Sequence, residues 1–304
     1  MAHEGLFLDK DMGRSRRQNT DFKYPKLGEM LEYIVKQQPK LLESSEMREQ
    51  KLLFSSKMYV AMINFLLKCF ESEMEQNNSL GRSTEFLSSV ETMCLLLEHA
   101  MAYEGSVELH ATASKALITI GSYLPEMIAS HYVPKISWLK QLMSHVDLDT
   151  RESAARLLGI ACSAIPPATS SDLISELLSA ISKTNNLRFE TLHGILCAIG
   201  YTTAECMSIA AAIPGTLFQK ILKCLTDVVI SETATLASIA MQALGHIGLR
   251  APLPPLVDDS SSVDILILLN EKLSKLLSVY VGQRLRMSCL LLGRLCHFCG
   301  VAFL

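Results

Sequence analysis

The residues best suited to metal chemistry lie near the end of the chain, in Cys296-His297-Phe298-Cys299. Two thiols separated by two residues, with an imidazole beside them, could bind zinc. A closed zinc site needs four ligands, however, and Cys289 is the only further candidate nearby. We therefore expect no metal site here. Most of the nine cysteines fall inside apolar helical patterns, which indicates buried, reduced thiols.

Other signatures of catalysis are missing from the sequence. It contains neither of the glycine-rich patterns that cradle phosphates, Gly-x-Gly-x-x-Gly and Gly-x-x-x-x-Gly-Lys-Ser/Thr. His193 and Cys197 are one helical turn apart, but no second pair completes a tetrahedral metal site. Because no Ser/His/Asp arrangement can be argued either, the sequence predicts no catalytic residue, no cofactor and no enzymatic activity.

Composition excludes several classes of protein. Of 304 residues, 49% are hydrophobic and only 19% are charged, against about 25% in typical soluble domains. The charge-free residues 233–249 still contain Ser238, Gln242 and His246, which favours burial inside a protein over a membrane span. A net charge of −3 gives no basic field for nucleic acid, so we interpret Arg14-Ser15-Arg16-Arg17 as a solvated loop.

Apolar residues recur at steps of three and four from residue 55 onward, which is the spacing of amphipathic helices. Sustained alternation with a period of two does not occur, and the prolines lie between the apolar runs. The sequence therefore predicts an all-α fold joined by short turns. The expected helices cover residues 55–76, 84–104, 107–122, 135–145, 149–164, 171–182, 187–204, 216–229, 232–249 and 263–277.

These helices are copies of a repeated unit. An apolar residue followed by glycine recurs at Gly121, Gly159, Gly200 and Gly245, at intervals of 38, 41 and 45 residues. This period is typical of HEAT and armadillo arrays, in which each unit is a helical hairpin. We expect an outer helix followed by an inner helix in each unit. Alanine and glycine on the inner helix should let neighbouring units approach closely.

The clearest repeat is residues 146–159, in which acidic residues in a turn precede an arginine and a run of small and apolar residues. Asp147 or Asp149 can cap the following helix, where an acid also suits the helix dipole. In HEAT families such an Asp and Arg form ladders between repeats. We therefore assign structural roles to Asp149 and Arg151, with a catalytic carboxylate as the weaker alternative.

Four stretches of the sequence are more specific than its composition. They are Tyr24-Pro25-Lys26-Leu27-Gly28-Glu29-Met30-Leu31, Gln37-Gln38-Pro39-Lys40-Leu41-Leu42, His145-Val146-Asp147-Leu148-Asp149-Thr150-Arg151-Glu152-Ser153-Ala154-Ala155-Arg156-Leu157-Leu158-Gly159 and Met241-Gln242-Ala243-Leu244-Gly245-His246-Ile247-Gly248. These stretches resemble the plant form of a proteasome-associated HEAT-repeat scaffold family called extracellular mutant twenty-nine. The resemblance covers residues 1–278, and since members of the family are several times longer, it corresponds to an internal segment of their N-terminal half.

The resemblance implies an adaptor that binds the proteasome, stabilises or monitors the joining of its core and regulatory particles, and tethers it to other components. The expected partners are subunits of both particles and other proteins, without nucleic acid and without direct insertion into a membrane. The first apolar run stops after three residues, which argues against a secretory signal. We expect the cytoplasm and the nucleus as its location. The alternative is a generic solenoid adaptor, of the transport-receptor or phosphatase-scaffold type.

We expect three parts in the chain: a loop with short helices over residues 1–53, the repeat array over 54–278, and an off-pattern tail over 279–304. The family continues its array where the tail begins. Plausible codons for a later stretch of the family, read one nucleotide late, give residues 287–304 of this chain. We therefore expect a shifted reading frame in the tail, which would make its Cys-His-Phe-Cys cluster an accident.

Overall fold

The computed structural model describes residues 24–37, 56–76, 83–102, 106–183, 187–207, 213–231, 234–258 and 261–280. In chain order the elements are α1 Leu27–Gln37, α2 Ser56–Gln76, α3 Thr84–Ala102, α4 Val107–Tyr123, α5 Pro125–Tyr132, the 3-10 helix η4 Val133–Lys135, α6 Ile136–Leu142, α7 Leu148–Cys162, α8 Pro167–Lys183, α9 Phe189–Met207, α10 Gly215–Ser231, α11 Ala234–Gly248, β1 Leu256–Asp258, β2 Ser261–Val263 and α12 Ile265–Tyr280.

Local sequence explains where several helices begin. The Ser106 side chain accepts a hydrogen bond from the backbone N–H of Leu109 and so caps α4. Pro125 and Pro167 are the first residues of α5 and α8, where a proline loses no helical hydrogen bond and its fixed φ already suits the helix. Proline therefore opens helices in this chain as well as separating them.

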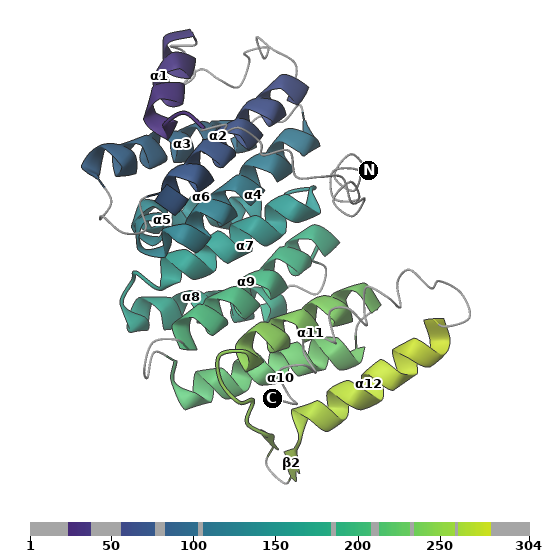
Figure 1. Cartoon of the computed structure of the whole chain (residues 1–304). Helices are drawn as coiled ribbons and strands as arrows, with labels where there is room; N and C mark the ends of the chain where they lie inside the picture. Colours follow the sequence, from purple (N-terminus) through teal and green to yellow (C-terminus); the bar gives the residue numbers. More distant parts are fainter. Residues whose placement is uncertain are drawn as a thin grey trace, which may run out of the picture.

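The helices form two rows that run the length of the array (Figure 1). In the inner row α2 contacts α4, α4 contacts α7, α7 contacts α9, and α9 contacts α11. The outer row contains α1, α3, α5 with α6, α8, α10 and α12. The outer helices α3, α6, α8 and α10 each precede their inner partner in sequence, so α3 packs on α4, α6 on α7, α8 on α9 and α10 on α11. This arrangement is an α-solenoid.

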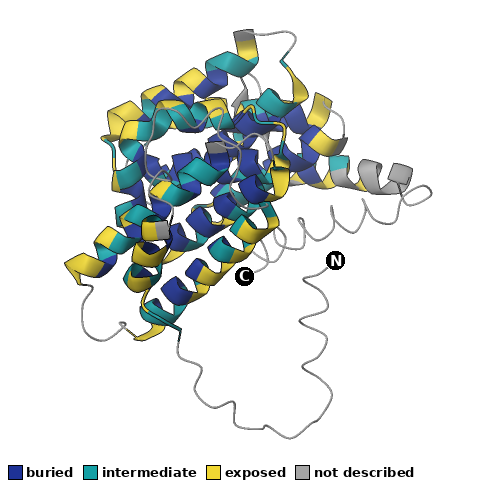
Figure 2. Cartoon of the chain, turned by 90° about the horizontal axis from the view of Figure 1, so that it is seen from above, coloured by how far each residue is buried: buried dark blue, intermediate teal, exposed yellow. Residues whose placement is uncertain are grey.

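One continuous hydrophobic core fills the space between the two rows, from Leu27 in α1 to Leu269 in α12. Figure 2 shows buried segments on the facing sides of the helices and exposed segments on the outward sides. The inner helices are buried most completely. In α9, for example, every residue from His193 to Gly200 is buried, because repeats cover the helix on both flanks.

The predicted all-α solenoid is confirmed, with two local differences. Helix α5, which has eight residues and begins at Pro125, is not among the expected helices. Neither is the small antiparallel hairpin between α11 and α12, in which Leu256 pairs with Val263, among the expected elements. Strands of three residues are too short for an alternating pattern to show.

The proposed three-part division stays a prediction. Helix α1 lies in the expected N-terminal part, and the proposed border between residues 278 and 279 falls inside α12. Residues 1–23 and 281–304 lie outside the described residues, and with them the Arg14-Ser15-Arg16-Arg17 run and the Cys296-His297-Phe298-Cys299 cluster.

Candidate functional site

The acidic turn of the clearest repeat serves the start of α7. The Asp147 carboxylate accepts hydrogen bonds from the Thr150 backbone N–H and hydroxyl, both at 2.7 Å. Asp147 is thus the N-cap that the sequence suggested. Asp149 lies in the first turn of α7 and forms an ion pair with Lys115 of α4, with 2.9 Å between Nζ and Oδ2. Both acids support helix packing, and Asp149 ties one repeat to the one before.

Arg151 is a buried cation that holds the α6–α7 turn in place. Its Nη1 donates to the carbonyl oxygens of His145 at 2.7 Å and Val146 at 2.9 Å. Its Nε lies 3.4 Å from Nδ1 of His193 in α9, the inner helix of the next repeat. Arg151 is therefore bonded mainly to main-chain carbonyls, in place of the acidic partner that a HEAT ladder would give it. Its place in the structure is that of a packing residue.

Three of the four repeated glycines lie where inner helices touch. A Cβ added to Gly159 of α7 would come 3.0 Å from the carbonyl of Tyr201 in α9, and one added to Gly200 of α9 would come 2.6 Å from Cβ of Ala243 in α11. Gly121 faces Ile160 in the same way across α4 and α7. The fourth repeat glycine, Gly245, is half-buried in α11.

The tightest glycine was not among the predicted residues. A Cβ on Gly194 of α9 would lie 2.0 Å from the carbonyl oxygen of Met143, which directly follows α6. Gly194 stands six residues before Gly200 and outside the apolar-glycine repeat. The distance from Gly194 to Met143 in the sequence hides this contact, and no local pattern could have found it.

The partly exposed side of the inner row carries a polar network that spans three repeats. The Tyr201 hydroxyl donates to Glu152 Oε1 at 3.1 Å, and the Gln242 amide approaches the same oxygen at 3.4 Å. The Tyr201 and His246 rings lie 4.6 Å apart. Burial, followed by the Glu152 carboxylate, raises the pKa of Tyr201. We define these four residues, Glu152, Tyr201, Gln242 and His246, as the inner-face network.

This network gives the inner face the chemistry of a binding surface. Its half-buried tyrosine, histidine, amide and carboxylate are held in position by one another, and Arg156 is exposed one turn from Glu152 on α7. Tyrosine and arginine are enriched among the residues that dominate protein interfaces. Solenoids commonly bind partners along such a row of successive helices.

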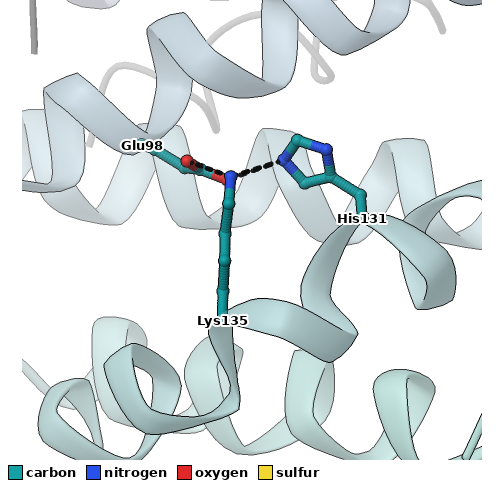
Figure 3. Close-up of polar contacts among 3 residues, drawn as sticks. All are labelled: Glu98, His131 and Lys135. Atoms are coloured by element: carbon teal, nitrogen blue, oxygen red, sulfur yellow. Dashed lines mark hydrogen bonds and ion pairs between the residues drawn. The ribbon is translucent and has the colours of Figure 1, made fainter.

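The outer row is joined by a second cluster, shown in Figure 3, between α3 and the α5–η4 segment. Lys135 Nζ lies 2.7 Å from both carboxylate oxygens of Glu98 and 2.9 Å from Nε2 of His131. That Nε2 lies 2.9 Å from Glu98 Oε1. Burial by itself would raise the pKa of Glu98, but the hydrogen bonds and charges of His131 and Lys135 leave that pKa below its ordinary value.

The Glu98 cluster should make stability fall in acid. Because the pKa of Glu98 is lower in the folded chain than in the unfolded chain, the unfolded chain takes up the proton first as the pH falls. The stabilisation that the ionised Glu98 side chain gives the fold is present above about pH 4.5 and is lost as the pH falls through the pKa of Glu98 in the folded chain. Glu98→Gln should therefore lose about 1 to 3 kcal/mol at pH 6 and progressively less below pH 4.5. Urea unfolding of both proteins across this range measures the difference.

Glu75→Gln is the control for this experiment, since Glu75 is exposed at the end of α2. It should shift the unfolding midpoint little at any of these pH values. A constant difference between wild type and Glu98→Gln from pH 6 to pH 3 would contradict the proposed linkage.

Burial makes Cys94 and Cys162 poor nucleophiles. It raises the pKa of both the Cys94 and the Cys162 thiol to about 12, so almost none of either is thiolate near pH 7. Among the described residues, no group of three or more His, Cys, Asp or Glu side chains could hold a metal ion. Within the same residues, no helix is long and apolar enough to cross a bilayer.

Part of the chain is similar to ECM29 proteins. Residues 71–216 match the family of ECM29 ARM-like repeats. The human (Homo sapiens) proteasome adapter and scaffold protein ECM29 is 27% identical over an alignment of 154 residues, which covers 45% of this chain. The matched part spans only 8% of the length of that relative. No solved structure matches the chain.

Proposed function

We propose that this ECM29-like chain is a non-catalytic part of a proteasome adaptor, in which stacked helical repeats bind the proteasome. The observation that carries the proposal is the match over residues 71–216 to repeats of a protein named as a proteasome adapter and scaffold. The matched range contains α4, α7 and α9 in full, which supply much of the inner row.

The proposed partners are subunits of the proteasome core and regulatory particles. By binding both, the adaptor would stabilise or monitor their association and tether the proteasome to other components. We place it in the cytoplasm and the nucleus. The inner-face network supports a binding role, because it presents polar and aromatic groups from three successive repeats at fixed positions.

Co-sedimentation of the purified chain with purified 26S proteasomes tests the proposal. We expect the chain to sediment with the proteasome. Added salt should weaken the binding in proportion to the part of the contact that is electrostatic. The same assay with separated core and regulatory particles shows which of them is bound. A solenoid of similar size from an unrelated transport receptor is the matched control.

Failure to co-sediment, by a chain whose circular dichroism is still helical, would contradict the proteasome role. It would favour the alternative, a solenoid adaptor for other proteins.

A further inference from the structure

The first residues of three successive inner helices are apolar and exposed. Val107 of α4, Leu148 of α7 and Phe189 of α9 are 55%, 43% and 42% exposed. Each is followed at the second helical position by an acid. We define these six residues, Val107, Glu108, Leu148, Asp149, Phe189 and Glu190, as the apolar rim.

Contacts between neighbouring elements place the three helix starts side by side. His110 Nδ1, one turn after Val107, lies 3.1 Å from His145 Nε2, three residues before Leu148. The Thr191 hydroxyl, two residues after Phe189, lies 3.2 Å from the Ser144 hydroxyl. The rim is therefore one continuous edge of the solenoid, and Val146, 78% exposed in the α6–α7 turn, adds to its apolar surface.

The needs of the fold explain the acids of the rim but not its apolar residues. A carboxylate in the first turn is stabilised by the helix dipole, which accounts for Glu108, Asp149 and Glu190. Val107, Leu148 and Phe189 keep 55%, 43% and 42% of their surface in water, although the Phe189 ring lies beside that of His193 with 6.0 Å between the ring centroids. A large part of their apolar surface is therefore not used in packing. Exposed apolar residues that adjoin one another are a mark of interaction surfaces.

The spacing of the rim selects the shape of a partner. Packed helices lie about 8 to 10 Å apart, so successive rim positions repeat at about that distance. An α-helix brings every seventh residue back to the same face after about 10.5 Å. In an extended strand, residues i and i+3 are also about 10 Å apart, but their side chains point to opposite faces of the strand. The rise of a helix over seven residues is thus close to the spacing of the rim, and it keeps the repeated residues on one face.

The charges of the rim select the partner further. Lys115 pairs with Asp149, and the exposed Arg188 precedes Phe189, but Glu108 is exposed and Glu190 is half-exposed beside apolar neighbours. Basic residues next to the apolar residues of the partner would face these two acids.

We propose that the apolar rim receives an amphipathic helix of a proteasome subunit, with an apolar residue at every seventh position and lysine or arginine beside it. The identity of the partner as part of the proteasome rests on the function proposed above. The chemistry of the contact rests on the rim itself.

Binding of purified 26S proteasomes to full-chain variants tests the inference. The double variant Leu148→Ser/Phe189→Ser should bind at least about tenfold more weakly than wild type, since the variant loses two apolar contacts at the rim centre. Glu108→Lys/Glu190→Lys should also weaken binding and should reduce its dependence on salt. The matched control is Ile267→Ser, because Ile267 is 60% exposed on α12, away from the rim.

The outcomes separate the two proposals. Wild-type binding that both rim variants retain within about twofold overturns the rim inference and leaves the proposed function standing. Absence of wild-type binding overturns the proposed function and, with it, a proteasome helix at the rim. Circular dichroism of each variant shows that it is folded, and the charge-reversal variant decides the matter if the serine variant loses helicity.

Discussion

Replacing Gly194 by alanine should destabilise the chain by about 3 kcal/mol or more. The new Cβ would lie 2.0 Å from the Met143 carbonyl oxygen, and backbone atoms cannot move aside as the end of a flexible side chain can. The segment after α6 and helix α9 would have to separate, opening the core beneath them. Thermal unfolding followed by circular dichroism should show a lower midpoint, and Gly200→Ala should act in the same direction against Ala243.

Gly215→Ala is the matched control, because a Cβ there meets nothing within 4 Å. Gly215 is the first residue of α10, and alanine costs less chain entropy than glycine in a helix, so this change should be neutral or slightly stabilising. Equal midpoints for Gly194→Ala and Gly215→Ala would show that α9 and the segment after α6 do not approach as closely as described.

Replacing Arg151 by methionine should cost about 2 to 5 kcal/mol, from two carbonyl groups that each lose a charged donor. The carbonyls of His145 and Val146 would have to find water in a partly buried turn, and the contact with His193 would be lost as well. Methionine keeps most of the apolar stem, so the change isolates the guanidinium. Urea unfolding of the purified protein measures the loss.

Arg156→Met provides the comparison on the same helix, because Arg156 is exposed and should change stability by less than about 0.5 kcal/mol. Arg151→Lys should recover only part of the loss, since lysine lacks the planar fork that reaches both carbonyls and His193. Similar unfolding curves for Arg151→Met and Arg156→Met would contradict the structural role assigned to Arg151.

The sequence predicted the array well because the inner helices are buried between neighbouring repeats, and this burial leaves a strong pattern of apolar and small residues along each helix. Apolar spacing and the repeated glycines gave the helices, their pairing and the solenoid. Helix α5 was missed because Pro125 and Pro134 were interpreted as places between helices, whereas Pro125 opens one. The start of α8 was placed four residues late for a similar reason, since Pro167 is its first residue.

Contacts between repeats could not be predicted in the same way. Glu98 reaches Lys135 across 37 residues, and Glu152 reaches Gln242 across 90. Periodicity shows which face of a helix is buried, but the partner across the interface depends on how far each repeat is rotated against the next. Asp147 was predictable as a cap because its contact with Thr150 is local. The inner-face network and Gly194 were not.

The close glycine contacts also govern how the array can bend. At Gly159 and Gly200 the inner helices meet through backbone and Cβ atoms, with no flexible side chain between them to compress. Inner helices packed in this way cannot move closer together, so the length of the inner row should change least when the solenoid bends. Flexing of the solenoid should therefore stretch or close the outer row while distances along the inner face stay nearly constant. A partner bound on the inner face would experience little strain as the scaffold bends.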